Sequence, residues 1–111
     1  MAETRDTLAR CVGWAGRFRA AVGEKDALLA STEFSASTHS LVRLSCTDAA
    51  TLRMSYTMQL QAARAAGVEL FAWTWIMPFG GAFRPAWSTK HMLHLLGVPG
   101  IAADTRSDIC G

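Results

Sequence analysis

The sequence has few of the residues that mark specialised classes of small protein. Its three cysteines, Cys11, Cys46 and Cys110, are widely spaced and include no C-x-x-C pair. This spacing argues against both a disulfide framework and a zinc site. Basic residues form no block and the formal net charge is only +2, so we expect neither a nucleic acid nor a membrane surface as a partner.

Long apolar runs and leader-like segments are also missing. The longest apolar run, Leu70 to Phe79, is far shorter than the about 20 residues that a membrane helix needs. The first residues mix acids and bases before any apolar stretch, which is not the shape of a signal peptide, and the localisation stays open. Hydrophobic residues make up 50% and charged residues 18% of the 111 positions. That composition predicts a packed globular domain without solenoid repeats or low-complexity linkers.

Apolar spacing and capping residues predict three helices. The first has apolar residues at helical spacing opposite four arginines, and Gly23 ends it. Thr47 or Asp48 can cap the second, and Gly67 supplies its end. The predicted ranges are Thr4–Val22, Asp48–Ala66 and the segment from the Ser88 cap to Leu96.

Two strands are predicted between these helices. Ala27–Phe34 is short and apolar before it changes to small polar residues, and Val68–Ile76 is rich in β-branched and aromatic residues. The resulting order, α-β-α-β-α, favours a parallel sheet of the α/β class. Two strands alone leave open edges and an uncovered face, so further strands are expected to come from elsewhere. We predict residues 101–111 as a loose tail.

The carboxyl ends of parallel strands are where ligands bind, and several chemically capable residues fall there. Glu33 lies at that end of the first strand and could attack an anomeric carbon, although a solvated glutamate is the simpler explanation. Trp73 and Trp75 alternate along the second strand with Phe71 and could stack on sugar rings, although such aromatics more often belong to a core. His39 follows the first strand and could touch a substrate.

Other candidate sites are weak, and we expect neither a metal nor a cofactor. His91 and His94 stand three residues apart without a carboxylate or cysteine at suitable spacing. Gly80-Gly81 is not followed by the helix and Lys-Ser/Thr of a phosphate loop. Glu69 opens the second strand, at the end where a structural role is expected.

Three stretches resemble glycoside hydrolase family five, in particular its exo-β-1,3-glucanase-like members. "LLASTEFSAST" (28–38) is similar to strand seven, where a glutamate before an aromatic and a serine is the nucleophile. "FAWTWIMPFGGAFRPAWSTKHML" (71–93) is similar to strand eight and the final helix, and "LARCVGWAGRFRAAV" (8–22) to the helix before strand seven. Their order and spacing cover nearly the whole chain.

The resemblance implies that residues 1–100 are the C-terminal part of a (β/α)8 TIM barrel, with two parallel strands and three helices. It implies Glu33 as the nucleophile, with Trp73, Trp75 and His39 contacting a β-glucan or another β-linked glycan. Thr32 stands where the family usually has glycine, and Met77-Pro78 replaces more polar residues. The family's acid/base glutamate follows an asparagine, and this sequence contains no asparagine. A retaining mechanism needs two carboxyl groups about 5–5.5 Å apart, so we expect the isolated chain to be inactive.

Two other interpretations stay open. The chain could be a small α/β protein that self-associates through its sheet and binds carbohydrate or another partner without catalysis. It could also become active by assembling with a complementary barrel fragment that carries the acid/base. Only the second interpretation requires Glu33 for function, and only it requires a different chain that carries the acid/base.

Overall fold

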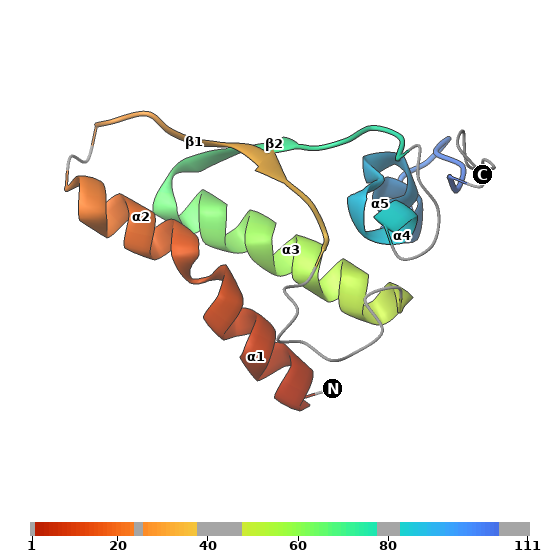
Figure 1. The fold of residues 1–111 in the computed structure, drawn as a ribbon, viewed down its shortest axis with the longest axis horizontal. Coiled ribbons are helices and arrows are strands. Elements are labelled where there is room, and N and C mark those ends of the chain that lie inside the picture. Colours follow the sequence, from red (N-terminus) through yellow and green to blue (C-terminus); the bar gives the residue numbers. More distant parts are fainter. Residues whose placement is uncertain (1, 24–25, 38–47, 78–82, 105–111) are drawn as a thin grey trace.

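The computed structural model describes residues 2–23, 26–37, 48–77 and 83–104, which form two parallel strands and five helices (Figure 1). The elements are α1 (Ala2–Val12), α2 (Trp14–Val22), β1 (Leu29–Phe34), α3 (Ala49–Ala66), β2 (Val68–Ala72), α4 (Phe83–Trp87) and α5 (Thr89–Leu95). The strands form one layer and α3 lies beneath them, with α1 and α2 on one side of α3 and α4 and α5 beyond the ends of the strands. Among the described residues, no helix has the length and apolar character needed to cross a membrane.

The two strands pair in parallel, and α3 connects them, as predicted. Leu29 is opposite Val68, and Ser31 is opposite Leu70. The register then shifts, because β1 advances three residues to reach Phe34 while β2 advances two to reach Ala72. The extra residue is a β-bulge in β1. Both strands are shorter than the predicted ranges, which extended from residue 27 and to residue 76.

Local capping fixes α3 at both ends, where the sequence predicts them. The side chain of Asp48 accepts a hydrogen bond from the Thr51 backbone amide at 2.8 Å. Gly67 ends the helix in the left-handed conformation, at a φ of 65°, and its amide donates to the last-turn carbonyls. Glycine adopts this conformation without the steric cost that a side chain adds.

The inner face of α3 forms the main core beneath the strands. Leu52 is fully buried and Tyr56 is 7% exposed. The Tyr56 ring lies 5.0 Å from that of Phe34, measured between centroids. Leu60, one turn further on, has the helical spacing to pack against the strands in the same way, but its side chain is 40% exposed. A second buried cluster, Ala15, Leu29, Ala63 and Val68, lies at the start of the two strands.

The predicted helix over residues 4–22 is divided in two at Gly13. Its backbone, at φ −63° and ψ −5°, leaves α1 and begins α2. Glycine is a weak helix former because it has the most conformational freedom to lose. Both halves contact α3, so the change of direction lets each half pack on the same helix.

Arg19 joins three parts of the fold through backbone carbonyls. Its guanidinium donates to Ala66 at 2.9 Å and to Gly67 at 2.7 Å, at the end of α3, and to Ala27 at 2.9 Å, before β1. Helix ends leave carbonyls without intrahelical partners, and a nearby cation satisfies them. Arg19 therefore fastens α2 to the turn between α3 and β2.

The C-terminal region contains one helix that sequence reasoning missed and one that it predicted. α4 is a five-residue turn of helix, too short for apolar periodicity to reveal. Ser88 caps α5 by accepting a hydrogen bond from the His91 amide at 3.2 Å, as predicted. Its hydroxyl also donates to the carboxylate of Asp104 at 2.8 Å. The first residues of the segment predicted as a loose tail are thus tied to α5 at a buried carboxylate, and residues 105–111 lie outside the described part.

Candidate functional site

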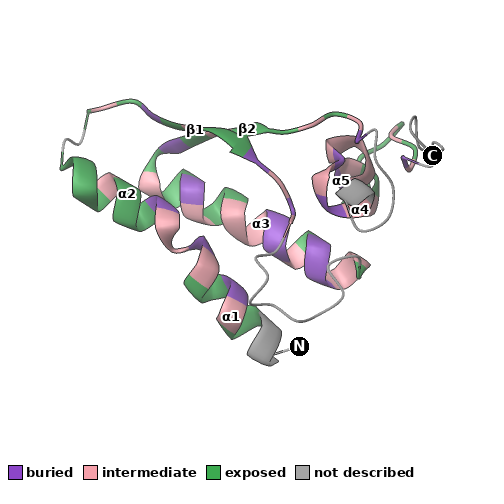
Figure 2. Cartoon of the chain, in the orientation of Figure 1, coloured by how far each residue is buried: buried purple, intermediate pink, exposed green. Residues whose placement is uncertain are grey.

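Three exposed aromatic rings follow one another at the end of β2. Phe71 is 58% exposed, Trp73 43% and Trp75 51%; we call residues 71–75 the aromatic segment. No described element covers the strands on the side away from α3 (Figure 1), and Figure 2 shows most of their surface as exposed. β2 itself ends at Ala72, so strict strand alternation does not extend to Trp75. Exposed rings of this size can stack on an apolar ligand face.

Glu33 lies in the bulge of β1, near the same end of the sheet. It follows the exposed Thr32 and precedes the buried Phe34. Within the described residues, its carboxylate has no ion-pair partner. The Trp73 amide donates to the Phe34 carbonyl at 3.0 Å, so the backbone of Trp73 is next to the residue after Glu33. The structure thus places the backbones of Glu33 and Trp73 near the same end of the sheet.

Beyond the strand, the aromatic segment is attached to the start of α5. The Thr74 amide donates to the Trp87 carbonyl at 3.0 Å, and the Thr74 carbonyl accepts from the Thr89 amide at 2.8 Å. The peptide bond between Trp73 and Thr74 is cis. The two hydrogen bonds of Thr74 attach the backbone between Trp73 and Trp75 to the start of α5, while both tryptophan rings stay exposed.

Two other residues bear on the predicted site, His39 and Trp87. His39 lies outside the described residues, and its role stays a prediction. Trp87, an aromatic in the same stretch of sequence, is partly buried and packs against the core that contains Leu52 and Met92. A ring in that position contributes to packing and is not available as an open platform.

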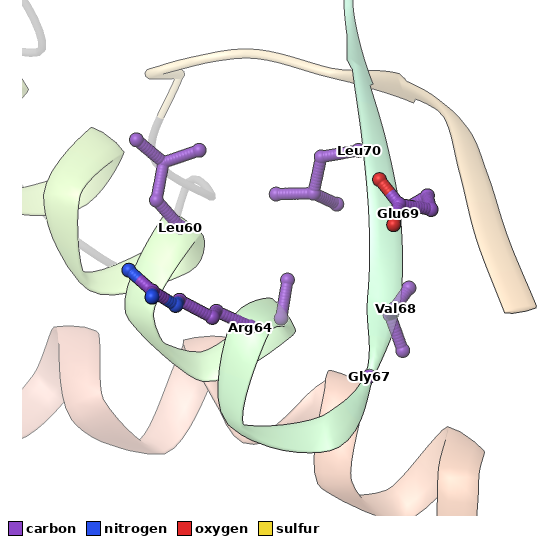
Figure 3. Close-up of a pocket in the computed structure, with 7 residues that line it drawn as sticks. Leu60, Arg64, Gly67, Val68, Glu69 and Leu70 are labelled. Carbon is purple, nitrogen blue, oxygen red and sulfur yellow. The ribbon is translucent and has the colours of Figure 1, made fainter.

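A hollow of about 400 Å³ lies at the opposite end of the sheet, where β2 begins (Figure 3). Its described lining comes from the last turns of α3, from Gly67 and from β2. The lining residues are Leu60, Ala63, Arg64, Gly67, Val68, Glu69 and Leu70. Neither Glu33 nor Trp73 is among these residues, so the hollow is separate from the predicted site. Glu69, expected to be structural, lies at its β2 wall and is exposed.

Burial and neighbouring charges shift the pKa of His91, one of the two histidines on α5. Burial lowers the pKa of His91, and the neighbouring His94 lowers it further, while Asp104 acts in the opposite direction. The two rings are 6.4 Å apart between centroids, and His94 Nδ1 lies 3.0 Å from the Ile101 carbonyl. In the described parts of the chain, no group of three or more histidine, cysteine or acidic side chains is arranged to hold a metal.

The buried link between Ser88 and Asp104 is the polar feature that sequence reasoning missed. Asp104 is 5% exposed although it stands sixteen residues after Ser88 in a segment without apolar periodicity. Capping rules identify Ser88 but give no signal for its second partner. Ser88 is only 1% exposed. Its hydroxyl therefore cannot act as a nucleophile toward an external substrate.

A scan against protein-family models and searches of curated proteins and of solved structures found no match to this chain.

Proposed function

We propose that the chain corresponds to strands seven and eight of a (β/α)8-barrel glycoside hydrolase of the family-five type. In this proposal, Glu33 is the nucleophile, Trp73 stacks under the sugar in the cleaving subsite, and Trp75 and His39 contact the same glycan. The main support is the parallel β1-α3-β2 unit, in which Glu33 lies near the carboxyl end of β1 and Trp73 directly follows the carboxyl end of β2. This is the end of the strands at which barrel enzymes build their active sites.

The proposed chemistry is one half of a retaining mechanism. The carboxylate of Glu33 attacks the anomeric carbon, the glycosidic bond breaks, and a covalent glycosyl ester forms. The leaving oxygen must be protonated by a second carboxyl group about 5–5.5 Å away. The sequence has no asparagine, whereas the resembling family carries its acid/base glutamate directly after one. We therefore expect the chain to bind a β-glucan and to turn it over only if another chain supplies the acid/base.

Glycan binding can be tested by calorimetry or NMR titration of the chain with laminarin oligosaccharides. Trp73→Ala should weaken binding about fivefold, the size expected for loss of one aromatic stacking contact. Phe18→Ala is a matched control, because Phe18 is a similarly exposed aromatic on α2. No saturable binding, or equal affinity in both variants, would contradict the assignment of Trp73.

Catalysis is tested separately with aryl β-glucosides and laminarin. We expect no turnover by the isolated chain. Turnover that is abolished by Glu33→Gln would contradict the expected inactivity and would support the role of Glu33.

A second candidate function is a carbohydrate-binding or self-associating module without catalysis. It is favoured by the three exposed rings of the aromatic segment. Such a module should bind glycan equally well with Glu33→Gln and should not form a covalent sugar ester. The nucleophile proposal instead predicts that a covalent sugar ester forms on Glu33.

A further inference from the structure

The strand β2 has an open edge beside the hollow. The described sheet contains only β1 and β2, so β2 is paired on one side. The Trp73 amide points to β1, where it donates to the Phe34 carbonyl. In a strand of a parallel sheet, alternate residues bond to the same neighbour, so the backbone amides and carbonyls of Leu70 and Ala72 face the open edge. A partner strand would find a preformed row of donors and acceptors there.

The hollow continues this edge as a groove between β2 and α3. Figure 3 shows Leu60 of α3 and Leu70 of β2 on facing walls. Ala63 and Val68 also line it and are buried. The described lining includes no residue of β1, which places the hollow on the unpaired side of β2. An extended segment paired with this edge would direct alternate side chains into the apolar groove.

The charge at the groove selects the kind of segment. Arg64 is exposed on the α3 wall and has no ion-pair partner within the described residues. Glu69 lies on the β2 side of the hollow, across from the Arg64 guanidinium in Figure 3. A carboxylate that enters along the α3 wall therefore meets an uncompensated cation, whereas a cationic side chain there meets a like charge.

We propose that the open edge of β2 and the adjoining groove bind an extended peptide segment by strand addition. The segment places apolar side chains between Leu60 and Leu70 and a carboxylate beside Arg64. Strand addition of this type obtains affinity from main-chain hydrogen bonds and specificity from alternate side chains. The surface is separate from Glu33 and Trp73. In a complete barrel this edge of β2 would be paired with another strand, so the peptide proposal concerns the chain on its own, and the glycan-binding and catalysis experiments test the glycosidase proposal separately.

The test uses the full chain, labelled with ¹⁵N, and two synthetic nine-residue peptides. Both alternate threonine and valine, and one valine is replaced by glutamate in the first peptide and by lysine in the second. In the free protein, the amide of Leu70 should exchange with solvent faster than that of Phe71, whose neighbour is β1. The glutamate peptide should slow exchange at Leu70 and Ala72 without changing it at Phe71.

Binding of the two peptides to two charge-reversal variants tests whether Arg64 is the cation that the peptide carboxylate contacts. Arg64→Glu should weaken binding of the glutamate peptide about threefold to fivefold, the size of a surface ion pair, and strengthen binding of the lysine peptide. Arg53→Glu is the matched control, because Arg53 is an exposed arginine on the same helix outside the groove. The proposal is overturned by a Leu70 amide already protected in the free protein, by peptide binding that leaves Leu70 and Ala72 unchanged, or by equal effects of the two charge reversals.

Discussion

Removing the side chain of Arg19 should unfasten α2 from the turn between α3 and β2. The guanidinium makes three hydrogen bonds to carbonyls, at 2.7 to 2.9 Å. Hydrogen bonds to charged groups contribute about 1.5–3 kcal/mol each in protected positions. Arg19 is only partly buried, and water can replace it at the released carbonyls. We therefore expect Arg19→Ala to lower the free energy of unfolding by about 2–3 kcal/mol in total.

Urea unfolding followed by tryptophan fluorescence and circular dichroism measures this loss. With a slope of about 1–3 kcal/mol per molar urea, the midpoint should fall by about 1–3 M. Arg17→Ala is the matched control, because Arg17 is exposed on the same helix and should change the midpoint little. Arg19→Lys should lie between wild type and Arg19→Ala, since an ammonium cannot reach three carbonyls in the same planar arrangement. Equal midpoints for Arg19→Ala and Arg17→Ala would refute this explanation.

Three further predictions concern the core, the cap of α3 and the uncovered sheet. Leu52→Ala should cost about 3 kcal/mol of unfolding free energy and Leu60→Ala clearly less, because only Leu52 is fully buried; equal losses in urea titrations would contradict the described packing. The hydrogen bond from the Thr51 amide lowers the pKa of Asp48 from its ordinary 3.8. The stability that the ionised Asp48 side chain contributes is therefore complete above pH 3.8 and is lost as the pH falls through the lowered pKa. The urea-midpoint difference between wild type and Asp48→Asn should therefore narrow at acid pH, and a constant difference would exclude this linkage. The aromatic segment and the open strand edges should cause self-association and binding of a hydrophobic fluorescent dye; a sharp monomer in sedimentation with no dye binding would count against an uncovered sheet.

Features set by neighbouring residues could be predicted from the sequence. The ends of α3 follow from Asp48 and Gly67, which act on backbone groups within one turn. The parallel pairing follows from the alternation of helices and strands. The convergence of Glu33 and Trp73 follows in turn from that pairing, because equivalent ends of parallel strands lie together.

Features set by distant contacts could not be predicted. The strand pattern continues to Ile76, but β2 ends at Ala72 and Thr74 bonds to residues near the start of α5. Leu60 is exposed where it lines the hollow beside β2, a position that its helical spacing does not encode. The bulge at Glu33 likewise reflects the register between two strands, and a single strand's sequence carries no signal for it. The hollow beside Leu70 likewise results from the unpaired edge of β2.

The assignment of Glu33 as a nucleophile is tested most directly by covalent trapping with 2-deoxy-2-fluoro-β-glucosyl fluoride. Fluoride leaves without a proton, so the absent acid/base does not block attack on the anomeric carbon, and fluorine at C2 slows hydrolysis of the ester that forms. Intact-mass measurement followed by peptide mapping should find one fluorosugar on Glu33 and none in Glu33→Gln. An unmodified chain, or a sugar that appears on Glu69 as readily as on Glu33, would contradict the proposed half-site.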